Sequence, residues 1–316
     1  METSSFFEGP EKKLEVVVTP GFPALRSFGE GAWIRIVEAA GARVLSTLRS
    51  EQCDAYLLSE SSLFVFDDRF VLITCGRTTL VEALPQILEV IPQAAIAFLV
   101  YERKSEHFPE HQPTTFREDA RRLQRTFAGR TLRFGHEQGR CVEMFHTIAP
   151  YTPGTRSPTL EVLMHEIDVE VADPVAAGRF PRDTSLVASL GIDAVFPGFN
   201  TSEHVFKPAG YSLNALKGEE YYTVHVTPEE TGSYASFETN HGLGDRLASL
   251  VGSIVEIFRP RGFDVITFVN QVEPDLPVRG YRLAEHVVHD IGSHRVGYFQ
   301  YFAPPREPRT AREVEL

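Results

Sequence analysis

The sequence is poor in cysteine and lysine and has no long apolar segment, and each shortage excludes a class of protein. Its 316 residues include three cysteines, at positions 53, 75 and 141, without a CxxC pair. So sparse and odd a set is untypical of a disulfide scaffold or a zinc site. The apolar runs are too short to cross a bilayer, and charged residues follow Phe6-Phe7 at once, unlike a signal peptide. We therefore expect a reduced, cytoplasmic protein without a metal site.

Positive charge is also scarce. The chain has 31 Lys and Arg against 43 Asp and Glu, a formal net charge of −12. Nucleic acids and anionic membranes bind basic faces, so we expect neither as a partner. There are five lysines, and none lies in a motif typical of pyridoxal phosphate enzymes. That cofactor is therefore not expected.

The composition is otherwise that of a globular protein. Hydrophobic residues make up 42% of the chain, enough for a sizeable core. No low-complexity tract or Gly/Ser-rich linker divides it, so we expect one composite domain over residues 1–316. The polar segment 304–316 is predicted to be a disordered tail.

The clearest local pattern begins at Tyr56. Residues 55–66 and 69–75 are β-prone runs separated by Asp67-Asp68, which predicts a hairpin. Gly76 ends the second strand, Thr78 or Thr79 is positioned to cap a helix, and apolar residues from 80 to 91 follow helical spacing. Residues 95–101 then predict a buried strand.

The same order returns later in the chain. Residues 220–226 and 233–239 predict a second hairpin, an amphipathic helix is expected from about Asp245, and residues 263–270 predict another buried strand. Two similar halves packing on one another, the product of a duplication, would explain the repetition. The alternative is coincidence in an ordinary α+β protein.

Four polar residues, Ser59-Glu60-Ser61-Ser62, interrupt the first strand-like run. The plain interpretation is a β-bulge or a sheet edge. The alternative is a strained serine peptide whose hydroxyl attacks the preceding carbonyl. A two-residue turn at Asp67-Asp68 would place Glu60 and Ser61 opposite Cys75 and Thr74, although a buried cysteine is usually inert packing. His225 in a strand and Ser212 in a turn are, taken alone, more often structural than catalytic.

Taken together, several motifs resemble one family. They occur in this order: FFEGPEKKLEV (6–16), YLLSESSLFV (56–65), TCGRTTL (74–80), GYSLN (210–214) and HVTPEETGSYASFETN (225–240). In order and interval they are similar to the eukaryotic-type, pyruvoyl-dependent S-adenosylmethionine decarboxylase family, over essentially the whole chain. The resemblance implies a four-layer αββα sandwich, with two antiparallel sheets face to face and helices on the outer faces.

The resemblance also implies self-processing. Ser61 would attack the Glu60 carbonyl, and elimination would leave a β chain of residues 1–60 and an α chain of residues 61–316 that begins with a pyruvoyl group. His225 would be the base for elimination, and Ser212 would stabilise the intermediate. The pyruvoyl ketone would form a Schiff base with the substrate amine and accept the carbanion left by decarboxylation. Cys75 would protonate that carbanion.

The substrate-binding residues follow from the resemblance in the same way. Phe7 and Phe206 would sandwich adenine, and Glu229 would hold the ribose hydroxyls. The backbone at Leu58 and the carboxylate of Glu60 would line the pocket. A further set is acidic: Glu8 and Glu11 near the reacting centre, and Glu15, Asp168 and Glu238 at the site where some relatives bind putrescine as an activator.

Two departures and several alternatives accompany this reading. Ile73 stands where putrescine-activated relatives carry a lysine, and segment 132–146 lacks the family's aromatic pattern.

The substrate could instead be an amino acid such as ornithine or arginine, or the chain could be an inactive regulatory paralogue. Retention of Phe7, Phe206 and Glu229 favours the nucleoside, and retention of Ser61 favours activity. Relatives occur as monomers and dimers, and a homodimer would pair sheet edges.

Overall fold

The computed structural model describes residues 6–135, 139–148, 158–176, 185–269, 276–291 and 294–304. Within these residues the strands form two eight-stranded antiparallel sheets. The first sheet has the spatial order β2-β3-β4-β5-β1-β6-β8-β7. Its strands are β1 (Lys12–Val18), β2 (Val44–Arg49), β3 (Asp54–Leu58), β4 (Ser61–Val65), β5 (Arg69–Thr74), β6 (Ile96–Lys104), β7 (Gly129–Gly135) and β8 (Cys141–Thr147).

The second sheet repeats this arrangement, with the order β10-β11-β12-β13-β9-β14-β16-β15. Its strands are β9 (Thr159–His165), β10 (Asn200–Val205), β11 (Tyr211–Lys217), β12 (Glu220–Thr227), β13 (Tyr234–Thr239), β14 (Gly262–Val269), β15 (Arg282–Ile291) and β16 (His294–Phe302). Each strand of one sheet has a counterpart at the same place in the other. The predicted duplication is therefore confirmed at the level of topology.

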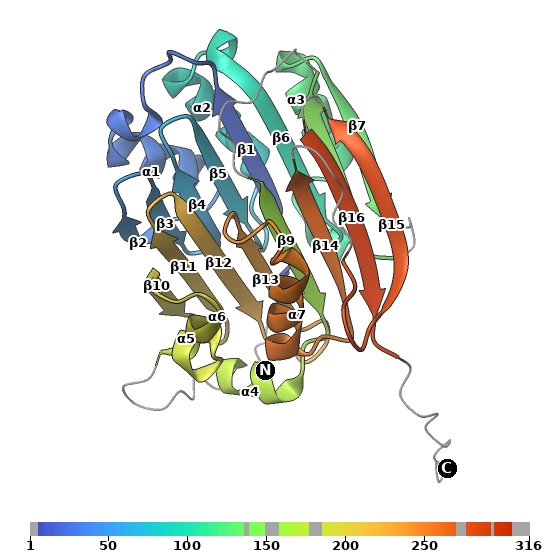
Figure 1. The fold of residues 1–316 in the computed structure, drawn as a ribbon. Coiled ribbons are helices and arrows are strands. Elements are labelled where there is room, and N and C mark those ends of the chain that lie inside the picture. The colour runs from blue at the N-terminus through green and yellow to red at the C-terminus, as the bar shows by residue number, and fades with distance from the viewer. Residues whose placement is uncertain are drawn as a thin grey trace, which may run out of the picture.

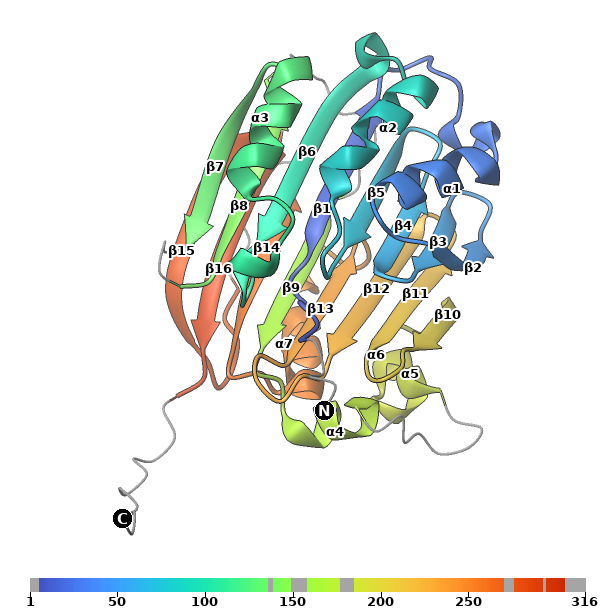
Figure 2. The same ribbon diagram turned by 180° about the vertical axis from the view of Figure 1, so that it is seen from behind.

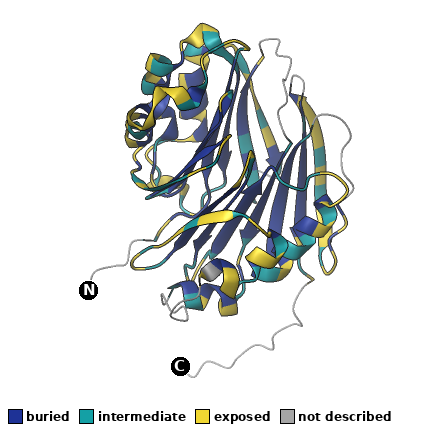
Figure 3. Ribbon diagram, turned by 60° about the vertical axis from the view of Figure 1, so that its left-hand side comes forward, coloured by how far each residue is buried: buried dark blue, intermediate teal, exposed yellow. Residues whose placement is uncertain are grey.

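Helices cover the outer face of each sheet, so the molecule has four layers (Figures 1, 2 and 3). On the first sheet lie α1 (Glu30–Ala39), α2 (Leu84–Val90) and α3 (Phe116–Thr126), with short 3-10 turns at Leu25–Phe28, Leu80–Ala83, Gln93–Ala95 and Pro109–His111. On the second lie α4 (Val169–Ala176), α5 (Leu186–Ser189), α6 (Ile192–Val195) and α7 (Leu247–Phe258). No helix within the described residues is long and apolar enough to cross a membrane.

Apolar clusters hold the layers together. One joins the first sheet to its helices, another joins the second sheet to its own, and two smaller clusters lie between the sheets. Buried polar side chains also lie between the sheets: His225 contacts Ser61, and Lys13 contacts Glu161, each on the facing sheet. The sandwich therefore has a buried polar centre between its sheets.

Most of the local predictions hold, but Ser212, predicted in a turn, lies instead in β11. The second hairpin, the helix of the second half and both buried strands lie where the pattern placed them, although α7 begins at Leu247 and the helix after Gly76 opens with a 3-10 turn. The run 55–66 is also not the single strand that was predicted. It turns at Ser59-Glu60, so that β3 and β4 pair with each other, with Leu58 opposite Ser61. The described parts of segment 132–146 lie mainly in β7 and β8, and residues 136–138 of it and 305–316 of the predicted tail lie outside the described residues.

Candidate active site

Ser61, the first residue of β4, has an unusual backbone conformation. Its φ angle is +139°, in a region that side-chain-bearing residues rarely adopt, and it is 1% exposed. The tight turn at Ser59-Glu60 and pairing with Thr74 on β5 fix it there. The strain falls on the residue that the sequence singled out.

The carbonyl of Glu60, just before Ser61, accepts two hydrogen bonds from Cys75. The backbone N–H donates at 2.8 Å and the thiol Sγ at 3.1 Å. The predicted register, with Glu60 and Ser61 opposite Cys75 and Thr74, is confirmed. Two donors aimed at one carbonyl oxygen would stabilise negative charge developing on it.

His225 approaches Ser61 from the facing sheet. Its Nε2 lies 3.0 Å from Ser61 Oγ, and its Nδ1 lies 2.8 Å from Ser212 Oγ. Ser212 and His225 face each other on β11 and β12, the counterparts of β3 and β4. Burial lowers the pKa of His225 to about 3, so the imidazole is neutral near pH 7. A neutral imidazole can accept the proton of a serine hydroxyl.

Three polar neighbours of this histidine were not predicted from the sequence. Ser62 Oγ and Thr223 Oγ1 lie 3.2 and 2.9 Å from His225 Nε2, and Asn214 Oδ1 accepts from both hydroxyls at 2.6 and 3.0 Å. Thr223 is two residues before His225, on the same face of β12. That alternation was the one signal in the sequence that could have identified it.

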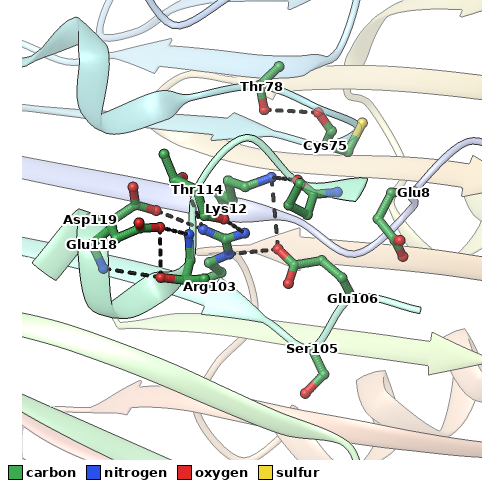
Figure 4. Close-up of polar contacts among 12 residues, drawn as sticks. Glu8, Lys12, Cys75, Thr78, Arg103, Ser105, Glu106, Thr114, Glu118 and Asp119 are labelled. Carbon is green, nitrogen blue, oxygen red and sulfur yellow. Dashed lines mark hydrogen bonds and ion pairs between the residues drawn. The ribbon is translucent and has the colours of Figure 1, made fainter. Parts of the chain in front are cut away.

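The turn at Cys75–Gly76 is held by hydrogen bonds to Thr78, Glu8 and Lys12. Thr78 Oγ1 donates to the Cys75 carbonyl at 2.9 Å (Figure 4). Gly76 N donates to the Glu8 carbonyl at 2.8 Å, and Lys12 Nζ donates to the Gly76 carbonyl at 3.2 Å. Thr78 was predicted as a possible helix cap. Its hydroxyl instead binds this turn, and no side chain caps the following 3-10 helix.

A cavity of about 570 Å³ opens beside this turn. It is lined by Phe6, Phe7, Glu8, Gly41, Glu60, Gly76, Arg77, Thr78, His111 and Gln112. Gly76 has φ +64°, and a Cβ there would lie 2.9 Å from Glu60 Oε2 and 3.1 Å from the Phe7 ring. Only glycine therefore allows the ring and the carboxyl group to close on the turn. Burial raises the pKa of Glu60 to about 7, against a smaller lowering by Arg43.

The two acidic residues predicted near the reacting centre lie in different environments. Glu8 lines the cavity and accepts from His107 N at 2.7 Å, His107 Nδ1 at 3.0 Å and Phe108 N at 3.0 Å. Burial alone would raise its pKa, but these donors together lower it, so Glu8 stays ionised.

Glu11 lies on the inner side, between the sheets. It accepts from Ser236 Oγ and, at 3.1 Å, from Tyr234 OH. Burial raises its pKa to about 7, opposed by Lys104 and by the two hydroxyls. Glu11 therefore sits near the midpoint of its titration at neutral pH, unlike Glu8.

The structure brings only some of the residues predicted to bind the nucleoside close together. Phe7 is 38% exposed at the cavity, and Glu229 Oε1 accepts from Phe7 N at 2.9 Å. Phe206 follows β10 and packs on His204, with ring centroids 4.7 Å apart, and it is not among the described residues that line the cavity. The Leu58 side chain is fully buried in the core under the helices, so only its backbone could line a pocket.

A second charged network lies between the sheets. Lys13 Nζ is 2.7 Å from Glu161 Oε1 and 3.0 Å from Glu238 Oε2. Lys104 Nζ is 2.7 Å from the other Glu161 oxygen and 3.1 Å from Glu102 Oε2. All five side chains are at most 6% exposed. Burial alone would lower the pKa of Lys13, but the surrounding carboxylates raise it well above its ordinary value.

This network includes only part of the predicted diamine site. Glu238 belongs to it, and Glu15 is a buried residue on the same face of β1 as Lys13. Asp168 does not join them. It precedes α4 at the protein surface, where Arg259 Nη2 lies 3.5 Å from it. The carboxylate that joins Glu238 is Glu161, which sequence reasoning missed together with both lysines. Ile73 lines a small interior cavity beside them.

Comparisons with known proteins agree with this geometry. The crystal structure of the Trypanosoma brucei AdoMetDC-delta26 monomer superposes with a TM-score of 0.60 at 24% identity, covering 77% of this chain and 99% of that one, which establishes the fold. A family model described as adenosylmethionine decarboxylase matches residues 4–302.

Several relatives carry the name S-adenosylmethionine decarboxylase proenzyme. That of Xenopus laevis is 35% identical over 291 residues, covering 86% of each chain. That of Leishmania donovani is 33% identical, covering 86% of this chain and 75% of its own, and that of Drosophila melanogaster is 32% identical, covering 85% and 84%. Fold and matches together define a carboxy-lyase built as a duplicated four-layer sandwich. The chain belongs to the adenosylmethionine decarboxylase family.

Proposed function

We propose that this chain cleaves itself between Glu60 and Ser61 and then decarboxylates S-adenosylmethionine, yielding CO2 and the aminopropyl donor for spermidine and spermine synthesis. The observation that carries the proposal is the Glu60–Ser61 peptide itself. Its serine is strained at φ +139°, its carbonyl accepts two donors from Cys75, and its hydroxyl lies 3.0 Å from His225 Nε2.

Cleavage begins with attack of Ser61 Oγ on the Glu60 carbonyl carbon. His225 takes the hydroxyl proton at Nε2, which requires that its Nδ1 carry the other hydrogen and donate it to Ser212 Oγ. Negative charge on the Glu60 oxygen is met by the N–H and S–H of Cys75. Loss of the Ser61 amide bond relieves the strained conformation and leaves Glu60 joined to Ser61 as an ester.

Elimination completes the processing. Removal of the Ser61 α-proton expels the Glu60 carboxylate and leaves a dehydroalanine, which water converts to a pyruvoyl ketone with release of ammonia. The products are chains of residues 1–60 and 61–316. They would remain together, because β1 of the small chain lies between β5 and β6 of the large one. We therefore treat the two chains as one composite unit.

The residues present fit a pyruvoyl group at position 61. When bound to a substrate amine, that group supplies the electron sink for decarboxylation. The chain's own contribution is to orient the substrate and deliver a proton. Cys75, held by two hydrogen bonds to the Glu60 carbonyl and one from Thr78, is the proposed proton donor to the substrate carbon.

The cavity supports a nucleoside substrate rather than a plain amino acid. The exposed Phe7 ring offers a surface on which adenine can stack, and Glu229 anchors the same segment. Glu8, which stays ionised, suits a sulfonium or an ammonium group. Ornithine or arginine would leave the aromatic surface without a partner.

We also propose that activation by putrescine is dispensable. The interior cavity lined by Glu11, Ile73 and Glu238 has a volume of only about 10 Å³, enough for a single water but not for a diamine. Lys13 and Lys104 already supply two positive charges to the carboxylates there. Adding putrescine to the purified enzyme should leave kcat and KM unchanged, and a several-fold rise in kcat would refute this part of the proposal.

Two further expectations accompany the function. The proposed proton donor requires a reduced thiol, and Cys75 is free, which fits a cytoplasmic enzyme. If the chain forms a homodimer, its largely exposed edge strand β15 offers a pairing surface. Light scattering of the purified protein would decide between monomer and dimer.

Release of labelled CO2 tests the reaction directly. Purified protein is incubated with carboxyl-labelled S-adenosylmethionine, ornithine or arginine in parallel. We expect release from the first substrate alone. Release only from an amino acid would transfer the chain to the alternative class, and release from none by a fully processed protein would favour the inactive paralogue.

A further inference from the structure

Lys12 is a buried ammonium beside the Cys75–Gly76 turn that the proposed reaction does not yet use. It is 1% exposed. Its Nζ donates to the Gly76 carbonyl at 3.2 Å and to Gln112 Oε1 at 2.9 Å. Gly76 and Gln112 both line the cavity, so this one ammonium ties two parts of the cavity wall together.

The carboxylates nearest to Lys12 are engaged elsewhere. Glu106 Oε1 is 4.0 Å from Lys12 Nζ but only 2.6 Å from Arg103 Nε, and Asp119 on α3 lies 2.8 Å from Arg103 Nη1 (Figure 4). Arg103 is the residue directly opposite Lys12 on β6. Among the described residues, Lys12 therefore has no carboxylate at close ion-pair distance, and its positive charge remains available to the turn.

Cys75 is the group on which that charge acts. Burial raises the pKa of the Cys75 thiol, and Glu60 and Glu11 raise it further, whereas Lys12 lowers it. In return, burial and Arg103 lower the pKa of Lys12 to about 8, opposed by Glu106, Cys75 and Asp119. Lys12 therefore partly offsets the burial and the two carboxylates that disfavour a Cys75 thiolate.

We propose that Lys12 is a further functional residue of this site: its ammonium positions the Cys75–Gly76 turn and stabilises the thiolate that forms when Cys75 gives up its proton. The inference rests on the proposed role of Cys75 as proton donor. In that step the S–H bond breaks, the proton passes to the substrate carbon, and the electron pair stays on sulfur. The charge of the nearby ammonium stabilises the thiolate until it regains a proton from water.

Alkylation of Cys75 by iodoacetamide, followed by peptide mass spectrometry, tests the electrostatic part without any substrate. The thiolate is the reactive form, so the rate reports its population. At about pH 8, Lys12→Met should slow alkylation of Cys75 roughly tenfold, the effect of about one pKa unit. Lys217→Met, a matched change at an exposed lysine, should leave the rate unchanged.

Cys53 reports on the integrity of the variant in the same experiment. It is fully buried, so it should stay unmodified as long as the protein remains folded. If Cys53 stays protected and Cys75 reacts at the wild-type rate or faster in Lys12→Met, the inference is wrong.

If Cys53 becomes reactive, the Lys12→Arg variant decides. Arginine keeps its charge at high pH, whereas Lys12 loses its charge above about pH 8. Cys75 in Lys12→Arg should therefore react like wild type near neutral pH and several-fold faster at about pH 9. Equal rates throughout this range would overturn the proposal.

Turnover provides the functional readout. We expect Lys12→Met to be processed at position 61 but to lose roughly tenfold in kcat, with a smaller change in KM. Lys12→Arg should retain activity and lose the decline that Lys12 imposes above about pH 8. Processed wild type without decarboxylase activity would instead refute the proposed function, and the alkylation result would stand by itself.

Discussion

Lys12 and Lys13 are neighbours in the sequence and equally buried, yet they lie in opposite electrostatic environments. β1 points Lys13 between the sheets, where Glu161 and Glu238 lie 2.7 and 3.0 Å away. It points Lys12 toward the helices, where a carbonyl and an amide are its close partners and the Glu106 carboxylate lies 4.0 Å away. The pKa of Lys13 is raised and that of Lys12 is lowered.

The comparison teaches that the partners of a buried charge, and not burial itself, decide what it can do. Lys13 neutralises carboxylates that would otherwise repel one another across the sheet interface. Its protonation is fixed, so it suits a structural role in place of an activator. Lys12 lies 4.0 Å from the Glu106 carboxylate, which is itself paired with Arg103, and its pKa is about 8. Its ammonium can therefore stabilise a negative charge that forms on Cys75 during the reaction.

The largest difference should appear in stability. Lys13→Met leaves Glu161 and Glu238 buried with one cation fewer, and breaking a buried pair typically costs about 3–5 kcal/mol. We expect a loss of this size in the free energy of unfolding by urea. Lys217→Met is the control, since that side chain is exposed. A loss below about 1 kcal/mol would mean that the inner network does not hold the sheets together.

Relieving the excess negative charge should recover part of this loss. In Lys13→Met/Glu238→Gln the carboxylate that lost its partner is neutral, so we expect about half of the stability to return. Glu238→Gln alone should be less stable than wild type, because it removes one ion pair. Strictly additive losses in the double variant would contradict direct pairing of Lys13 with Glu238.

Lys12 should instead be recognised by its effect on the pH dependence of the free energy of unfolding. Its pKa is about 8 in the folded protein against an ordinary value of 10.5, so between these values the unfolded chain binds more protons. Wild-type stability should therefore rise relative to Lys12→Met by roughly 1–3 kcal/mol from about pH 8 to pH 10.5. Taking the difference between the two proteins removes the contribution of buried tyrosines. A constant difference across this range would exclude a depressed pKa.

At neutral pH the same substitution should have the smallest effect on stability. Lys12 has no close carboxylate to leave unpaired, so Lys12→Met should change the free energy of unfolding by no more than about 1 kcal/mol. Denaturant unfolding of this variant beside Lys13→Met gives the contrast in one experiment. Equal large losses would show that both lysines are structural.

Local sequence pattern predicted most of the fold because each element depends on nearby residues. Alternation and turn residues indicated both hairpins, and helical spacing indicated α7. The hairpin register then placed Cys75 beside Glu60. The turn at Ser59-Glu60 was missed because β-prone residues flank it on both sides, so composition alone gives no sign of a reversal.

Contacts between the sheets were beyond such patterns. Lys13 meets Glu161 across 148 positions of sequence, and nothing local to either residue indicates the other. Asp168 was assigned to the acidic cluster by resemblance, whereas it lies outside the sheet interface, beside Arg259. The neutral state of His225 likewise depends on burial by both sheets.

The most direct test of the account concerns the bond between Glu60 and Ser61. Purified wild-type protein is denatured, its intact masses are measured, and the tryptic peptide that ends at Arg69 is sequenced by mass spectrometry. The account predicts two chains, with that peptide beginning at position 61 with a ketone in place of a serine amine. A single intact chain, or a large chain that begins with an unmodified Ser61, would contradict it.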